Sequence, residues 1–158
     1  MATDILELQI SSEFGRMVSP PLRSKRLGER KMTENEIGKV VVDAAITLHK
    51  ELGSGLLETV YEVILARELE RRGLKVQRQV KIPIEFDGIK FEEGFRSDII
   101  VENKVMLELK SVECVTKAHK KQLLTYLRLT EVKLGFLLNF GEALMRDGIT
   151  RIVNGLEE

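Results

Sequence analysis

The chain has little that would mark it for export, for a membrane or for a disulfide-rich fold. Its single cysteine, Cys114, excludes an internal disulfide framework. No apolar run approaches the roughly 20 residues of a membrane-spanning helix, and no basic region precedes the interrupted apolar stretch at residues 5–10. We therefore expect a cytoplasmic protein with no secretory signal and no membrane partner.

An excess of one charge is also missing, since 25 Lys and Arg balance 25 Asp and Glu. This balance excludes binding to nucleic acid through overall charge alone, so any such surface has to be local. We find no Gly-rich phosphate loop, serine nucleophile elbow or dinucleotide fingerprint. Cys114 has no metal-ligand spacing to His49 or His119, so a zinc site is not expected.

The composition fits one globular domain preceded by an extension. The 158 residues are 43% hydrophobic and 32% charged, which is typical of a soluble chain with a core. Residues 1–31 show no sustained periodicity and contain Pro20-Pro21. We expect a flexible N-terminal extension over residues 1–31 and a domain over residues 32–158.

Hydrophobic periodicity predicts the order helix, helix, strand, strand, strand, helix, strand, with a last short strand. A meander of three strands followed by a crossover helix indicates an α/β fold, with a mixed sheet and helices on its faces. The expected elements are a helix from the capping box at Thr33 to Gly53, a helix from Ser54 or Gly55 to Arg72, strands over 75–86, 91–101 and 105–110, a helix over 117–129, and strands over 134–140 and 149–153.

The most informative spacing places Asp98 ten residues before Glu108. Each lies in an apolar run, and the runs flank the polar residues 102–104, a pattern that predicts a β-hairpin. With a three-residue tip Asp98 lies opposite Glu108, and alternation puts Lys110 on the same face as Glu108. With a two-residue tip Asp98 would face Leu109 instead.

Two carboxylates facing each other across a sheet destabilise it unless something compensates their charge. A divalent cation is one compensation, because Mg²⁺ takes one or two carboxylates together with water and phosphate oxygens. The alternative is an ordinary surface hairpin that carries Asp98, Glu108 and Lys110 on its wet face.

Three further residues are candidates, each with a plain structural alternative. Glu58 lies in the first turn of the second helix, where a glutamate at N3 also caps free amides. Gln122 and Tyr126 stand four apart and share a helix face, where they can contact a phosphate or simply mark an amphipathic boundary.

Basic residues cluster between positions 117 and 133, against one acid, Glu131. The cluster is either a local nucleic-acid surface or a solvated helix face. Its members are Lys117, His119, Lys120, Lys121, Arg128 and Lys133.

Together these residues resemble a known family. Asp98 followed by Glu108-Leu109-Lys110 resembles the PD-(D/E)XK nuclease superfamily, with Arg96-Ser97-Asp98 in place of the usual Pro-Asp. Residues 122–126 look like the Q-x-x-x-Y motif of its RecB-like branch. Residues 55–61 match the name-giving motif of the GxxExxY protein family, and residues 138–141 and 148–153 also resemble that family. The resemblance covers roughly residues 33–155.

The resemblance implies a restriction-endonuclease-like fold and a Mg²⁺ (or Mn²⁺) site. Asp98 and Glu108 would ligate the ion, with the Leu109 carbonyl as a third ligand. Glu58 would add a carboxylate for a second ion or for the water shell. Lys110 would orient the attacking water and stabilise charge on the phosphate.

For the substrate side, the resemblance implies that Gln122 and Tyr126 line the site and touch phosphate. The function it implies is a Mg²⁺-dependent nuclease acting on DNA. Two alternatives stay open: a non-catalytic nucleic-acid-binding or assembly module on the same fold, and a structural or protein-interaction domain. The small size also suggests a homodimer or larger assembly.

Overall fold

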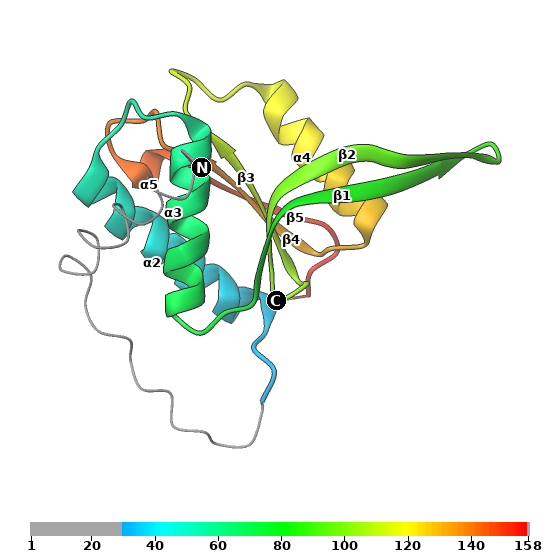
Figure 1. The fold of residues 1–158 in the computed structure, drawn as a ribbon, viewed down its shortest axis with the longest axis horizontal. Helices are drawn as coiled ribbons and strands as arrows, with labels where there is room; N and C mark the ends of the chain where they lie inside the picture. Colours follow the sequence, from blue (N-terminus) through cyan, green and yellow to red (C-terminus); the bar gives the residue numbers. More distant parts are fainter. Residues whose placement is uncertain (1–29, 158) are drawn as a thin grey trace, which may run out of the picture.

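The computed structural model describes residues 30–157. The extension expected over residues 1–31 therefore lies almost entirely outside the described residues. The elements, labelled as in Figure 1, confirm the predicted order and add one short helix, α5. They are α2 (Glu34–Leu52), α3 (Glu58–Arg71), β1 (Val76–Phe86), β2 (Ile89–Val101), β3 (Val105–Lys110), α4 (Lys117–Thr130), β4 (Leu134–Asn139), α5 (Met145–Gly148) and β5 (Ile149–Val153).

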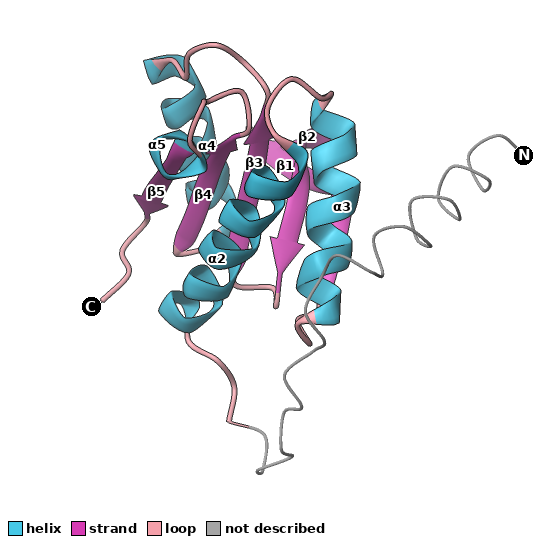
Figure 2. Ribbon diagram, turned by 90° about the vertical axis from the view of Figure 1, so that its left-hand side faces the viewer, coloured by secondary structure: helices cyan, strands magenta, loops and turns pink. Residues whose placement is uncertain are grey.

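The five strands form one mixed sheet in the order β1-β2-β3-β4-β5. All neighbours are antiparallel except β3 and β4, which run parallel. Parallel neighbours need a crossover, and α4 supplies it between them. Figure 2 shows α2 and α3 on one face of the sheet and α4 on the other. The predicted α/β fold, a mixed sheet flanked by helices, is confirmed.

Each face of the sheet has its own hydrophobic core. The first core lies under α2 and α3 and includes Leu107 and Leu109 of β3. The second lies under α4 and includes Met106 of β3. Because side chains alternate along a strand, Glu108 and Lys110 share the α4 side with Met106. Glu108 and Lys110 therefore lie on one face of β3, as expected.

The predicted start of α2 is confirmed in detail. The Thr33 hydroxyl accepts a hydrogen bond from the Glu36 backbone N–H (3.2 Å), and the Glu36 carboxylate accepts one from the Thr33 backbone N–H (2.8 Å). These two bonds form a capping box that satisfies two otherwise free donors. Gly53, with φ 73°, ends the helix as expected.

The predicted start of α3 was three to four residues too early, since the helix begins at Glu58. Gly55 has φ 99°, which no right-handed helix contains. The buried hydroxyl of Tyr61 donates to the Gly53 carbonyl (2.6 Å) and accepts from the Leu56 N–H (3.2 Å). This contact holds residues 53–57 as a loop, so Glu58 is the first helical residue rather than N3.

We expect Tyr61→Phe to lower the melting temperature by several degrees, because the Gly53 carbonyl and the Leu56 N–H lose the hydroxyl that bonds to both, at about 1 kcal/mol of unfolding free energy per bond. Thermal unfolding followed by circular dichroism measures the shift. Tyr126→Phe is the matched control, since among residues 30–157 its hydroxyl forms a hydrogen bond only with the exposed Gln122 side chain. Equal melting temperatures for Tyr61→Phe and the wild type would contradict the assigned role.

Strands β1 and β2 extend beyond the rest of the sheet as a two-stranded arm (Figure 1). The turn at Asp87-Gly88 has φ 49° and 73°, as a two-residue hairpin loop requires, so β2 begins at Ile89, two residues earlier than expected. Phe86 pairs with Ile89 across the arm, and both side chains are exposed. The arm therefore carries an uncovered apolar end.

Within residues 30–157, no helix has both the length and the apolar character needed to cross a bilayer.

Candidate active site

The β2–β3 hairpin has the three-residue tip that brings the candidate residues together. Pairing runs from Val101 opposite Val105 to Ile99 opposite Leu107, so residues 102–104 form the tip. The alternative two-residue tip is excluded. The pairing ends at Ile99 and Leu107, so Asp98 and Glu108 are the next residues of the two strands.

Asp98 lies where the two strands separate. Phe95 and Ile99 would share a face of a regular strand, yet Phe95 lies in the second core and Ile99 in the first. β2 therefore turns over between these two residues, so that its side chains change from one face of the sheet to the other. Its pairing with β3 stops at Ile99. The Asp98 carboxylate accepts a hydrogen bond from the Leu109 N–H (2.9 Å). A side chain thus takes the position of a backbone acceptor and fixes Asp98 against β3.

Glu108 has one bonded and one unsatisfied carboxylate oxygen. Lys110 Nζ donates to Oε1 (3.1 Å), whereas the buried Oε2 has no hydrogen-bond partner. An unpaired buried oxygen is costly unless a proton or a cation meets it. Burial, followed by repulsion from Asp98, raises the pKa of Glu108 to about 7.

The pKa values of Asp98 and Lys110 are also shifted by burial and by the neighbouring charges. Burial raises the pKa of Asp98 above its usual value, against the hydrogen bond from Leu109. Burial alone would lower the pKa of Lys110, but the charge and hydrogen bond of Glu108 raise it instead. The ammonium therefore stays charged, and it offsets only part of the negative charge that two ionised carboxylates would carry.

Glu58 stands at the edge of this site. Its carboxylate accepts a hydrogen bond from the Ser111 N–H (3.2 Å), and the Ser111 hydroxyl donates to the Leu56 carbonyl (2.7 Å). These bonds tie the start of α3 to the end of β3. Within residues 30–157, however, no three Asp, Glu, His or Cys side chains gather closely enough to hold one metal ion. In this geometry Glu58 therefore does not join Asp98 and Glu108 closely enough for the three carboxylates to share one ion.

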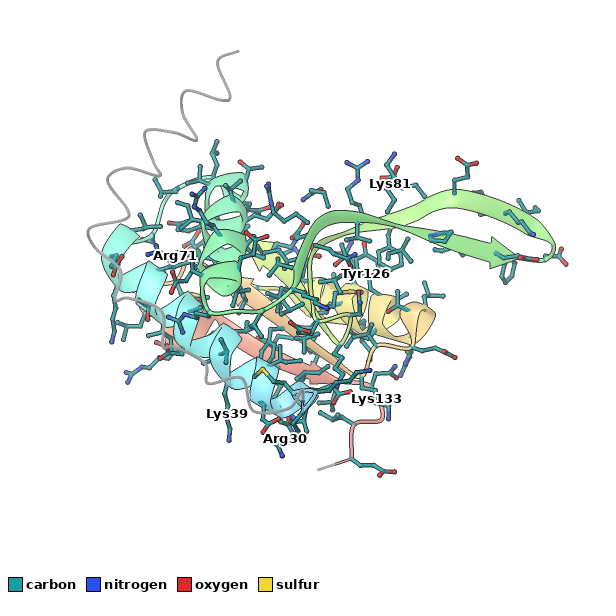
Figure 3. The ribbon with its side chains drawn as sticks, turned by 60° about the horizontal axis from the view of Figure 1, so that its bottom comes forward. Arg30, Lys39, Arg71, Lys81, Tyr126 and Lys133 are labelled. Atoms are coloured by element: carbon teal, nitrogen blue, oxygen red, sulfur yellow. The ribbon has the colours of Figure 1, made fainter. Side chains whose placement is uncertain are left out.

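Gln122 and Tyr126 face the same site from α4. The Gln122 side-chain amide donates to the Tyr126 hydroxyl (2.8 Å). The Tyr126 ring stacks on Phe95 with centroids 3.8 Å apart, and Figure 3 shows it between α4 and the arm. Burial, followed by the charge of Glu108, raises the pKa of Tyr126. Tyr126 on α4 is thus close enough to Glu108 on β3 to respond to its charge.

The comparison with family models decides the class of the protein. The model of the PD-(D/E)XK nuclease superfamily matches residues 35–152, which is most of the chain. The chain belongs to the PD-(D/E)XK nuclease superfamily. No curated protein and no solved structure matches it. The restriction-endonuclease-like fold is thereby confirmed, and the matched range includes Asp98 and the Glu108-Leu109-Lys110 end of β3.

The candidate nucleic-acid-binding residues on α4 of this PD-(D/E)XK domain comprise three exposed lysines and one histidine that caps the helix. Lys117, Lys120 and Lys121 are exposed in the first turns of α4, and none of them forms an ion pair with another described residue. His119 is half-buried and caps the helix: its Nδ1 accepts from the Thr116 N–H (3.2 Å). The structure therefore gives His119 a local role that the sequence prediction did not include.

Three residues beside the site were missed from the sequence. Glu62 is buried, and its carboxylate accepts hydrogen bonds from Arg78 and Gln79 of β1. The available signal was the spacing of Glu62, one helical turn after Glu58. Nothing in the sequence indicated that β1 passes next to it.

Proposed function

We propose that this PD-(D/E)XK domain is a Mg²⁺-dependent nuclease that hydrolyses phosphodiester bonds of DNA, with Mn²⁺ as an alternative ion. The observation that carries the proposal is the buried, unpartnered Oε2 of Glu108, set beside Asp98 and bonded to Lys110 through its other oxygen. A bound cation would meet this oxygen and offset the repulsion between the two carboxylates.

The donor set fits such an ion. Two carboxylates, Asp98 and Glu108, with the Leu109 carbonyl beside them, match the preference of Mg²⁺ for few protein oxygens and several waters. Glu58, already bonded to Ser111, belongs to the water shell or to a second ion. When bound, the metal would polarise the scissile phosphodiester and make hydroxide available near neutral pH.

The remaining side chains have separate tasks. Lys110 keeps a positive charge at the carboxylates, where it orients water and offsets charge developing on the phosphate. Gln122 and Tyr126 contact the substrate phosphate from α4. The nucleic-acid backbone is bound nearer the start of the same helix by Lys117, Lys120 and Lys121. His119, whose Nδ1 is already bonded to the Thr116 N–H, adds a weaker contact.

We also infer the finer classification. The hydrogen-bonded Gln122–Tyr126 pair supports the RecB-like branch. The loop closed by Tyr61, which leads directly into Glu58, gives a physical reason for the Gly55, Glu58 and Tyr61 spacing and supports the GxxExxY family. A cytoplasmic location and a homodimer or larger assembly stay predictions. Fractionation and light scattering, respectively, measure them.

A cleavage assay tests the nuclease. We expect the full chain to cut at least one of single-stranded, duplex or branched DNA or RNA when Mg²⁺ or Mn²⁺ is present, and to stop in EDTA. Asp98→Asn should lower the rate at least a hundredfold while preserving the fold, because its side-chain oxygen still accepts from the Leu109 N–H. Metal-dependent cleavage that survives this change would refute the assignment.

The second candidate is a non-catalytic nucleic-acid-binding module. The balanced charge and the lack of a three-carboxylate cluster within residues 30–157 favour it. It predicts binding without turnover, unaffected by Asp98→Asn and lost when Lys117, Lys120 and Lys121 are reversed in charge. A purely structural domain predicts instead that saturating Mg²⁺ leaves the melting temperature unchanged.

A further inference from the structure

A second buried carboxylate lies on α3, one turn after Glu58, and the proposed chemistry does not use it. Glu62 is 4% exposed. Its Oε1 accepts from Arg78 Nε (3.0 Å) and its Oε2 accepts from the Gln79 side-chain amide (2.7 Å). Both oxygens are thus satisfied, as a buried carboxylate requires.

The guanidinium of Arg78 is fixed through its Nε, and its terminal amino groups are left to bind a ligand. Its Nε is committed to Glu62, while its two terminal amino groups form no hydrogen bond or ion pair with any described residue. The side chain is 40% exposed. A guanidinium fixed in this way presents a planar fork to solvent, and that fork matches the geometry of phosphate oxygens.

The position of this fork is set by a distortion of β1. Arg78 pairs with Ile99 and Val80 pairs with Ser97, so Gln79 lies level with Asp98. Gln79 has φ 51°, a left-handed conformation that is strained for a residue other than glycine. Its bond to Glu62 helps to hold that conformation, and Arg78 is therefore fixed one residue from the level of Asp98.

The strand pairing places the two sites next to each other. Arg78 pairs with Ile99, the residue after Asp98 in β2, and Gln79, the other partner of Glu62, lies level with Asp98. Arg78 reaches Glu62 on the α3 side of the sheet, whereas Lys117, Lys120 and Lys121 lie on α4, which covers the opposite face. A nucleic-acid backbone passing Asp98 would thus meet cations from both sides.

We propose that Arg78, braced by Glu62 and Gln79, binds a backbone phosphate of the nucleic-acid substrate next to the phosphate that is cut. The inference rests on the proposed function for its ligand, because Arg78 pairs with Ile99, the residue next to the candidate carboxylate Asp98. Arg78 is a binding residue in this scheme, and Glu62 positions it.

The chain offers a matched control on the same helix. Glu68 is also 4% exposed and accepts from Arg72 Nε (2.8 Å). Arg72, however, donates through a terminal nitrogen to Asp43 (2.6 Å), and its side chain is 24% exposed. This pair has a similar buried anchor but no open fork near Asp98.

The test is the salt dependence of binding to fluorescein-labelled single-stranded and duplex DNA, measured by anisotropy with the full chain in EDTA at 50–200 mM salt. We expect Arg78→Ala to weaken binding about tenfold and to reduce the slope of log K against log salt by about one phosphate contact. Arg78→Lys should keep most of the slope, since the charge remains. Arg72→Ala should change neither quantity.

A second variant covers the case in which Arg78→Ala leaves Glu62 as an unpaired buried charge and unfolds the protein. Glu62→Gln with Arg78→Gln removes both charges together and should give the same loss of slope. An unchanged slope in a folded Arg78 variant, or no binding by the wild type, would overturn the inference. Wild-type cleavage with an unchanged slope would overturn this contact alone, whereas a lost slope without any cleavage would support the contact and refute the nuclease.

Discussion

Replacing Glu108 by glutamine is expected to abolish metal-dependent cleavage and, at the same time, to stabilise the metal-free protein at pH 8. Cleavage should fall at least a thousandfold, because glutamine is a poor ligand for a hard cation and removes one of the two carboxylates beside Lys110. The two effects have opposite signs because the carboxylate that suits the metal is unfavourable without it.

The direction of the stability effect follows from the pKa of Glu108. Its folded value of about 7 lies above the usual 4.5, so the folded state binds more protons than the unfolded state between those pH values. The protonated Glu108 side chain contributes fully to the free energy of unfolding below pH 4.5, and this contribution is lost as the pH rises through 7. Its loss is on the order of 3 kcal/mol. Glutamine does not ionise and avoids that loss.

Thermal unfolding in EDTA from pH 5 to 8 measures this difference. We expect the wild type to lose stability across the range relative to Glu108→Gln, and saturating Mg²⁺ to raise the melting temperature of the wild type only. Glu92→Gln, at an exposed position of the arm, is the matched control and should follow the wild type. A Glu108→Gln protein that melts below the wild type at pH 8 in EDTA would contradict the assigned electrostatics.

Much of the fold was predictable because its signals are local. The capping box at Thr33, the hairpin tip at residues 102–104 and the buried run of β4 each depend on neighbouring residues alone. The predicted start of α3 was wrong because a hydrogen bond from the Tyr61 hydroxyl to the Gly53 carbonyl holds the preceding residues as a loop. α5 was missed because four residues are too few to show a helical period.

The candidate site was predictable to the same extent. Asp98, Glu108 and Lys110 came together because a short hairpin fixes their register. The anchoring of Arg78 by Glu62 could not be predicted, since it joins α3 to β1 across a distorted strand. Periodicity assigns residues to faces of regular elements, and it fails where the backbone turns over, which is also where Asp98 lies.

Replacing Lys110 by methionine is expected to separate catalysis from metal binding. Cleavage should fall a hundred- to a thousandfold, since the positive charge that offsets charge on the phosphate is lost. Mg²⁺ should still raise the melting temperature, because Asp98 and Glu108 are retained. Methionine keeps the length and apolar stem of the side chain, so the effect reports the ammonium rather than packing.

The same change should shift the pH dependence of metal binding. Lys110 lowers the pKa of Glu108 through its charge and hydrogen bond, against the larger raising effect of burial. Without Lys110 that pKa rises above about 7, so protons compete with Mg²⁺ up to a higher pH. Calorimetric titration with Mg²⁺ from pH 6 to 9 measures the shift, with Lys90→Met on the exposed arm as control. If Lys110→Met lost metal binding at every pH, Lys110 would be holding the carboxylates in place rather than acting on the phosphate. If it kept full cleavage, the reaction would not depend on this ammonium.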